Sequence, residues 1–161
     1  MKKRESKLWQ RIKINIKKYH LIRVESNTIN GIPDINGCWA GKEFWIELKS
    51  DKVRYPKLSK WQISWINKRI SVGGVVIICN EALSERSLKL YRPLSPFTCP
   101  KKLKPLFSFS FPVAWPLFEE ALWEILEERS KLGEQQAKGQ RFANKLRDNT
   151  GGLTALDLAR C

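Results

Sequence analysis

The sequence predicts an α/β fold in which helices flank a mixed central sheet. Apolar residues recur at helical spacing over residues 5–19, and again over residues 58–72. The continuous apolar run 75–79 follows the second helix, as in a buried strand parallel to the strand before that helix. The run 43–49 alternates like a strand, with Trp45, Glu47 and Lys49 on one face and Phe44, Ile46 and Leu48 on the other.

Shorter elements complete the predicted core. Residues 21–26 and 32–35 are expected to form short strands, and residues 88–91 a further one. Asn36-Gly37 is a turn dipeptide, and residues 40–42 are a second turn candidate.

The second helix has clear end signals. Ser59 and Gln62 have the spacing of a capping box, and Gly73-Gly74 predicts the helix end. Its apolar side is expected to contain Trp61, Trp65, Ile66 and Ile70.

Three prolines mark a change of composition after the core. We therefore divide the chain into a core of residues 1–92 and an extension of residues 93–161. Within the extension we expect an extended aromatic segment at residues 106–111 and an amphipathic helix at residues 116–132. A polar tail follows, with a short helix near residues 141–147.

The charge of the chain points to a polyanionic partner. The formal net charge is +14, and residues 1–20 carry eight Lys and Arg against one Glu. Such a balance favours nucleic acid first and an anionic membrane surface second. Phosphate would meet the first hundred residues, because the last part of the chain is nearly balanced in charge.

Other chemistries are disfavoured by the composition. The four cysteines form no C-x-x-C pair and His20 is the single histidine, so neither a zinc site nor a disulfide framework is expected. The basic N-terminus lacks the apolar region of a signal peptide, and no apolar run is long enough to span a membrane. We therefore expect a cytoplasmic protein with reduced thiols.

Two carboxylates and a lysine define the candidate site. Asp34 ends one arm of a predicted hairpin, and Glu47 and Lys49 lie in the other arm. Carboxylates gathered at one point favour a hard cation such as Mg²⁺ or Mn²⁺. A lysine beside them in a strongly basic chain predicts phosphodiester chemistry rather than metal storage.

These residues resemble the PD-(D/E)xK nuclease superfamily, which has a restriction-endonuclease-like fold. The stretches 31–34, 44–50 and 58–66, followed by Gly73-Gly74 and an apolar strand, are similar to the virus-type replication-repair nuclease family, VRR-NUC, which is common in phages. The resemblance covers roughly residues 5–79.

The resemblance implies a role for each residue. Asp34 and Glu47 would bind Mg²⁺ with the main-chain carbonyl of Leu48, and Lys49 would position and activate the attacking water. Gln62 would lie near the site, although capping explains this residue equally well. Glu5 matches a further metal-binding carboxylate, but it also fits a helix N-terminus. Glu25 is an alternative to Glu5, and it also fits a salt bridge on a strand face.

DNA would be gripped by basic side chains from two regions. The first helix and the loop at residues 52–60 supply Lys2, Lys3, Arg4, Lys7, Arg11, Lys52, Arg54, Lys57 and Lys60. Lys68 and Arg69 could add to this set, and Tyr55 or Trp39 could stack on an unpaired base.

The substrate is left open by the sequence. The resemblance implies an endonuclease that leaves a 5′-phosphate, acting on branched or junction DNA, or on a specific duplex site as homing and restriction enzymes do. A third possibility is a basic DNA-binding protein without turnover. Cutting two strands favours a homo-oligomer, a dimer or tetramer, and residues 106–132 could supply its interface.

Overall fold

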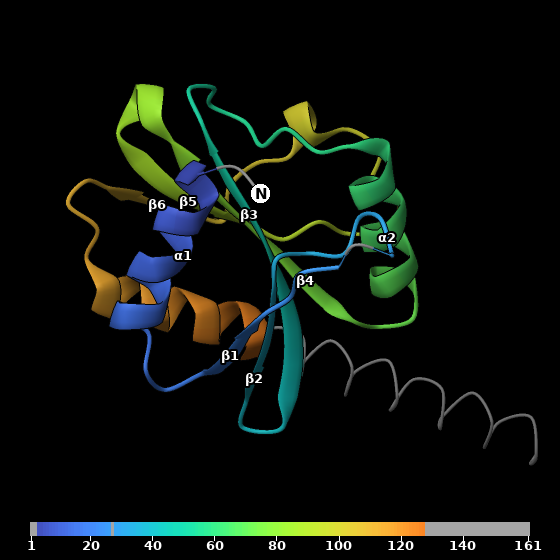
Figure 1. The fold of residues 1–161 in the computed structure, drawn as a ribbon, viewed down its shortest axis with the longest axis horizontal. Helices are drawn as coiled ribbons and strands as arrows, with labels where there is room; N and C mark the ends of the chain where they lie inside the picture. Colours follow the sequence, from blue (N-terminus) through green and yellow to red (C-terminus); the bar gives the residue numbers. More distant parts are fainter. Residues whose placement is uncertain (1–2, 27, 128–161) are drawn as a thin grey trace, which may run out of the picture. The chain divides into compact units, whose positions relative to one another are not determined.

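A six-stranded mixed sheet forms the centre of the computed structural model, which describes residues 3–26 and 28–127 (Figure 1). The strands lie side by side in the order of the sequence. They are β1 (His20–Arg23), β2 (Ile35–Trp39), β3 (Lys42–Asp51), β4 (Val75–Ala82), β5 (Ser87–Tyr91) and β6 (Phe107–Ser110). Neighbouring strands are antiparallel except β3 and β4, which are parallel.

Helices cover both faces of this sheet. Helix α1 (Lys3–Asn15) and a helix that begins at residue 115 pack on one face. Helix α2 (Lys60–Ser71) packs on the other face and makes the crossover between the parallel strands β3 and β4. Short 3₁₀ turns lie at Leu83–Glu85 and Pro100–Lys102. The predicted α/β class, with a mixed central sheet between helices, is therefore confirmed.

The alternation along β3 is confirmed by its packing. Phe44, Ile46 and Leu48 belong to the core under α1, whereas Trp45 packs in the core under α2. The same strand thus separates a face with three buried apolar side chains from the face that carries Glu47 and Lys49. This division places the candidate site on the α2 side of the sheet.

Helix α1 ends at Asn15, earlier than the apolar spacing predicts. The amide of Ile16 makes the last helical bond, to the carbonyl of Ile12 at 2.8 Å. Ile16 and Tyr19 are nevertheless buried, because the chain turns back along the core towards β1. The hydroxyl of Tyr19 donates to the carbonyl of Glu119 at 3.1 Å. The apolar spacing therefore predicted the buried residues correctly, but it overestimated how far the helix extends.

The predicted strand at residues 32–35 begins too early, since β2 starts at Ile35. The predicted turn at Asn36-Gly37 is wrong, because both of these residues lie inside β2, with Gly37 opposite Phe44 on β3. A Cβ atom at Gly37 would overlap the ring of Phe44, so this glycine makes room for an aromatic side chain. The hairpin turns instead at Ala40 and Gly41, whose φ angles of 49° and 75° suit a tight turn.

The capping box of α2 is confirmed, but the expected position of Trp61 is wrong. The Ser59 hydroxyl accepts from the Gln62 amide at 3.2 Å, and the Gln62 side chain accepts from the Ser59 amide at 3.0 Å. Ile66 is buried, with Trp65 and Ile70 packed beside it. Trp61 is 54% exposed, because the first turn of the helix projects its side chain away from the sheet.

The described part of the extension adds to the same sheet and core. Strand β6 pairs with β5, and Phe118, Leu122 and Leu126 pack in the core that holds α1. The predicted helix begins at residue 115 and its described part runs to residue 127. The boundary at residue 92 stays a prediction. The expected tail, including a helix near residues 141–147, lies outside the described residues.

None of the helices within residues 3–26 and 28–127 is long and apolar enough to cross a membrane.

We predict that Gly37→Ala destabilises the protein by about 1–3 kcal/mol, because the new methyl group must displace the buried Phe44 ring. Urea unfolding would measure this loss. Gly74→Ala is the matched control, since its Cβ would meet the flexible side chain of Arg69, and we expect a loss under about 1 kcal/mol. Equal losses for the two variants would contradict the packing described for β2 and β3.

Candidate active site

Strand β3 presents two charged side chains towards α2. Glu47 and Lys49 are two residues apart, so both point to the same side of the sheet, and both are buried. In the parallel ladder with β4, Glu47 lies beside Ile78 and Lys49 beside Asn80. The site therefore forms where β3 leaves its apolar stretch and approaches the loop to α2.

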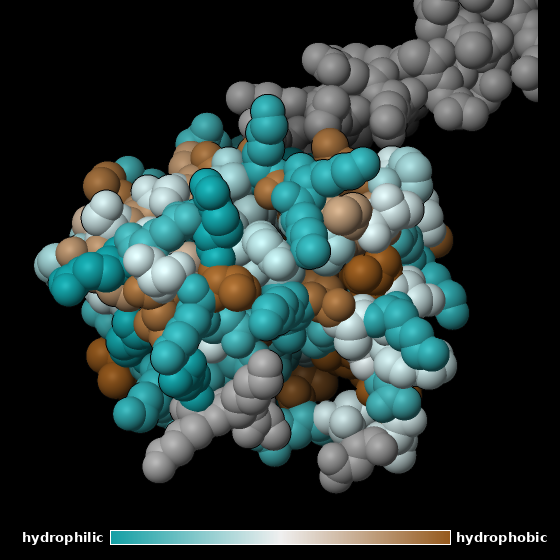
Figure 2. All heavy atoms as spheres, turned by 90° about the horizontal axis from the view of Figure 1, so that it is seen from above, coloured by the Kyte–Doolittle hydropathy of each residue, from teal (hydrophilic) through white to brown (hydrophobic). Residues whose placement is uncertain are grey.

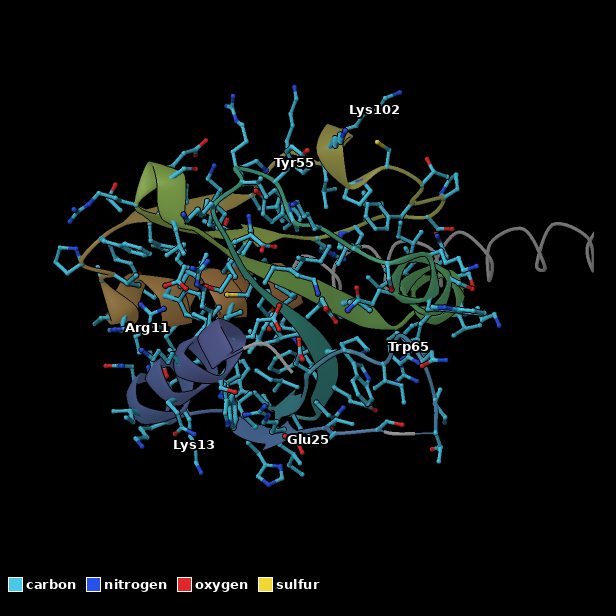
Figure 3. The ribbon with its side chains drawn as sticks, turned by 45° about the horizontal axis from the view of Figure 1, so that its top comes forward. Arg11, Lys13, Glu25, Tyr55, Trp65 and Lys102 are labelled. Carbon is cyan, nitrogen blue, oxygen red and sulfur yellow. The ribbon has the colours of Figure 1, made fainter. Side chains whose placement is uncertain are left out.

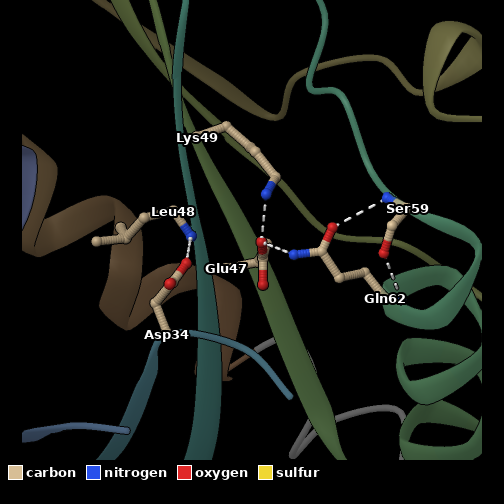
Figure 4. A network of polar contacts seen from close by, with 6 residues as sticks. All are labelled: Asp34, Glu47, Leu48, Lys49, Ser59 and Gln62. Atoms are coloured by element: carbon tan, nitrogen blue, oxygen red, sulfur yellow. Dashed lines mark hydrogen bonds and ion pairs between the residues drawn. The ribbon is translucent and has the colours of Figure 1, made fainter. Parts of the chain in front are cut away.

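Asp34 reaches this strand from the neighbouring arm of the hairpin. It immediately precedes β2, whose first residue Ile35 pairs with Ile46. Its Oδ2 accepts a hydrogen bond from the main-chain amide of Leu48 at 2.7 Å (Figure 4). Its main-chain carbonyl accepts from the amide of Val24 at 2.8 Å. The Asp34 carboxylate is thus held against the backbone between Glu47 and Lys49.

Glu47 is the centre of a polar network that is almost closed to solvent. Its side chain is 1% exposed. One oxygen, Oε1, accepts from the Lys49 ammonium at 2.6 Å and from the side-chain amide of Gln62 (Figure 4). The other oxygen, Oε2, is buried and has no hydrogen-bond partner among the described residues. Half of this carboxylate is therefore available to a ligand.

Gln62 combines two functions that the sequence left as alternatives. Its Oε1 caps α2 by accepting from the Ser59 amide, and its Nε2 donates to Glu47. The capping bond fixes the side-chain orientation, so the amide group points at the carboxylate rather than rotating freely. The start of α2 is thereby tied to the middle of β3.

The electrostatic environment disfavours ionisation of both carboxyl groups. Burial raises the pKa of Glu47 to about 8; the Lys49 charge opposes this rise and the Asp34 charge adds to it. Burial also raises the pKa of Asp34, against the opposing effect of the Leu48 hydrogen bond. Two neighbouring carboxyl groups with raised pKa values form a site that a cation would stabilise.

Lys49 stays charged despite its burial. Burial alone lowers the pKa of this lysine, but the charge of Glu47 and their hydrogen bond outweigh it, so the pKa lies above its ordinary value. The ammonium group is therefore a fixed positive charge and hydrogen-bond donor at neutral pH. It does not serve as a neutral amine base there.

The residues present fit a divalent cation through oxygen donors. A buried carboxylate oxygen without a partner and two carboxyl groups with raised pKa values are the observations that support this fit. No group of three or more His, Cys, Asp or Glu side chains converges on a metal position within the described part of the chain. Asp34, Glu47 and the Leu48 carbonyl would thus need water or substrate oxygens to complete a coordination shell.

Glu5 and Glu25 differ in their surroundings. Glu5 is buried on α1 and its negative charge contributes to the raised pKa of Glu47, so it lies within electrostatic reach of the site. It does not join Asp34 and Glu47 in a three-carboxylate cluster. Glu25 is exposed and pairs with Arg23 at 3.2 Å, so the expected salt bridge forms. The strand predicted over residues 21–26 ends at Arg23, however, and Glu25 lies beyond it.

The basic residues predicted to bind DNA are spread over several elements. Arg4 and Lys7 are exposed on α1, and Lys52, Arg54 and Lys57 are exposed on the loop between β3 and α2. The face seen from above carries many hydrophilic side chains, with apolar ones between them (Figure 2). Tyr55 lies on the same side as Lys102, with the Lys101 ammonium 5.5 Å from its ring (Figure 3). Lys2 and the side chain of Lys3 lie outside the described residues.

Some of these cations already have acidic partners. Arg11 bonds to the buried Glu81, and Arg54 pairs with Glu85 at 3.2 Å. Arg69 pairs with Glu43 at 2.7 Å. Trp39 packs against Tyr19 at a centroid distance of 5.6 Å, at the opposite end of β2 from Asp34. The structure therefore does not bring Trp39 to the candidate site.

Sequence reasoning missed a row of buried polar residues beside Lys49. Asn80 is Lys49's partner in the ladder, and Lys89 is the next residue across, paired with Glu85. Asn80 is fully buried, and neither of its side-chain polar atoms makes a hydrogen bond of ordinary geometry within the described part of the chain. The signal was present, because an asparagine directly after the apolar run 75–79 interrupts a buried strand.

Comparisons with known proteins show similarity to solved structures but not to a family model or a curated protein. No family model matches the sequence, and no curated protein matches it. Among solved structures, the chain is similar to Hjc, a Holliday junction resolvase from the archaeal hyperthermophile Archaeoglobus fulgidus, with 18% identity and a TM-score of 0.46. The match covers 73% of this chain and 96% of that one.

We predict that metal-free protein loses stability as pH rises from 5 to 8 because of Glu47. The ordinary pKa of 4.5 applies to the unfolded chain, whereas the folded pKa is about 8. Between these values the folded state holds a proton that the unfolded chain has released, so rising pH favours unfolding. The contribution is fully present below the unfolded pKa and is lost as pH passes the folded one.

Urea unfolding in EDTA at several pH values would measure this slope. We expect wild type to lose more stability than Glu47→Gln across this window, because the amide does not titrate. Parallel curves for the two proteins would contradict the raised pKa.

Proposed function

We propose that this protein is a divalent-metal-dependent DNA endonuclease that hydrolyses phosphodiester bonds. The single observation that supports this most strongly is the buried Glu47 carboxylate, which shares one oxygen between Lys49 and Gln62 and keeps the other without a partner. Asp34 lies on the adjoining hairpin arm. A storage site for metal would not need a charged lysine in direct contact with a ligand carboxylate.

The residues of this site would divide the work of hydrolysis. Asp34, Glu47 and the Leu48 carbonyl would hold Mg²⁺ or Mn²⁺, which when bound would polarise the scissile phosphate. Lys49 would orient the attacking water and offset the negative charge that develops on the phosphate. Gln62 would keep the Glu47 carboxylate in one orientation, so that Oε2 stays directed at the ligand.

The finer assignment within nucleases follows from the sequence motifs. The stretches around Asp34 and Glu47 resemble PD-(D/E)xK nucleases of the VRR-NUC type, which supports selectivity for branched or junction DNA and a 5′-phosphate product. We also propose a homo-oligomer, because one site cuts one strand. Sequence-specific duplex cleavage and DNA binding without turnover are the alternative outcomes of the assay below.

The deciding experiment is a cleavage assay in Mg²⁺ on matched four-way junction, flap, single-stranded and linear duplex DNA. Selective cutting of branched DNA, with loss of activity in EDTA, is the expected result. Cutting of a linear duplex at one sequence would instead indicate a sequence-specific endonuclease of the restriction or homing type. Binding without any cutting under these conditions would reject the enzyme.

We predict that Lys49→Ala lowers the cleavage rate at least about 100-fold while DNA affinity changes by less than about threefold. The loss follows because a positioned charge acts on the transition state, whereas binding depends on dispersed phosphate contacts. Single-turnover cleavage and fluorescence anisotropy would measure the two quantities. Lys42→Ala, at the opposite end of the same strand, should leave both unchanged. Full activity of Lys49→Ala would reject the assigned mechanism.

We predict that Gln62→Ala and Ser59→Ala separate positioning from capping. Ser59→Ala removes the hydroxyl that caps α2 but keeps the main-chain amide that orients Gln62, so it should cost about 1 kcal/mol of stability with nearly normal cleavage. Gln62→Ala loses the contact with Glu47 as well, and its rate should fall about tenfold or more. Equal cleavage rates in the two variants would mean that Gln62 serves only as a helix cap.

A further inference from the structure

A hollow lies at the start of α2, where Trp61 directly precedes Gln62 of the candidate site. It has a volume of about 320 Å³ and lies between the loop that follows β1 and one side of the helix. The residues that matter here are Ile29, Asn30, Trp61, Ser64, Trp65 and Lys68. Its size falls within the range of about 300–1,000 Å³ typical of small-ligand sites.

The two walls of this hollow are anchored differently. Trp65 packs edge to face against Trp45 of β3 at a centroid distance of 5.1 Å, so this indole is fixed beside the core under α2. Trp61, one turn earlier, is 54% exposed. An exposed indole next to a fixed one offers a flat apolar surface that the protein's own core does not use.

The loop wall is held against α2 by a close backbone approach. Gly31 has a φ of 88°, and a Cβ there would overlap the carbonyl oxygen of Trp61. Upstream, the amide of Ile29 donates to the Ser26 hydroxyl at 3.0 Å. The loop therefore has little freedom to close over Trp61, and the hollow is part of the folded structure.

Both walls are close in the sequence to residues of the candidate active site. Trp61 precedes Gln62, which contacts Glu47, and Gly31 lies three residues before Asp34. This connection distinguishes the hollow from the exposed aromatic surface around Trp123, on the helix that begins at residue 115.

The charges around the hollow fit a nucleotide. The Lys60 ammonium lies over the Trp61 ring, 5.0 Å from its centre, and Lys68 lines the hollow about two helical turns further along α2. Both lysines are exposed, and no ion pair within the described part of the chain occupies them. A cation that a base could displace from the indole, and a second cation in the hollow, suit a base and its phosphates. An apolar peptide would leave these charges without a complement.

We propose that this hollow binds one unpaired DNA base, stacked on Trp61, beside the phosphate to be cut. The proposal rests on the proposed nuclease function and specifies its substrate: DNA with an unpaired nucleotide at the cleavage point. A base inside an intact duplex is stacked on both faces and cannot reach Trp61. The recognition element for branched DNA would therefore be the extruded base rather than the overall shape of the junction.

Fluorescence anisotropy in EDTA tests this proposal independently of cleavage. The probes are three labelled duplexes, which carry a single bulged thymine, a bulged abasic residue at the same position, or no bulge. We expect wild type to bind the thymine bulge at least about tenfold more tightly than the abasic bulge, because base stacking on an aromatic side chain is lost in the latter. Equal affinity for the two bulges, or no binding of any probe, would overturn the proposal.

Substitutions in the hollow test whether it is the source of the preference for the thymine bulge over the abasic bulge. Trp61→Ala should reduce the thymine-to-abasic ratio to about one and leave affinity for the unbulged duplex within about twofold. Trp61→Phe should keep part of the ratio. Ser64→Leu should reduce the thymine-to-abasic ratio by filling the hollow. This variant tests the base site if Trp61→Ala fails to fold. Trp123→Ala is the matched control, an indole of similar exposure at 46%, and should keep the full ratio.

Failure of this inference and failure of the nuclease proposal are distinguishable. Discrimination without cleavage in Mg²⁺ would reject the enzyme and keep the base site. Cleavage of branched DNA with an unchanged ratio in Trp61→Ala would keep the enzyme and overturn the base site.

Discussion

The structure depends on the burial of one carboxylate, Glu47, in the middle of β3. Removing a carboxylate from water is costly, and the folded chain compensates with the Lys49 charge and the Gln62 amide on one oxygen only. The remaining oxygen and the raised pKa describe a site that is more stable with a cation than without one. Such a cost has no structural benefit that an apolar residue would not provide at lower free energy. It therefore points to chemistry.

The fold provides this site through the two faces of a single strand. One face of β3 presents Phe44, Ile46 and Leu48 and anchors the strand under α1, so these apolar contacts fix the register with β2 and β4 without help from the face of Glu47. The face of Glu47 can then carry buried charged groups that lower the stability of the fold. Helix α2 is tied to that face by a capping residue, which couples the start of the helix to the orientation of Glu47.

The sequence predicted those parts of the fold that follow from periodicity and capping. The alternation of β3, the buried parallel strand β4 and the capping box of α2 are each confirmed.

Prediction from the sequence failed where one residue type serves two purposes. Gly37 is a turn former in general, but here it accommodates the Phe44 ring across a strand pair. Trp61 has the spacing of a core residue, yet the first turn of α2 projects its side chain away from the sheet and leaves it exposed. Both outcomes depend on tertiary neighbours, which local patterns do not contain. The buried amide of Asn80 was visible in the sequence, but its position beside Lys49 follows only from the strand register.

The distribution of ion pairs bears on the surface that would meet the proposed DNA substrate. Several cations are already committed to acidic partners, among them Arg11 with Glu81 and Arg54 with Glu85. Each would have to exchange one anion for another on binding phosphate, which reduces the net gain. The lysines of the loop between β3 and α2, and Lys60 at the start of α2, have no such partner within the described residues, and Lys60 lies over the Trp61 ring. These lysines could therefore bind phosphate without first releasing an anion.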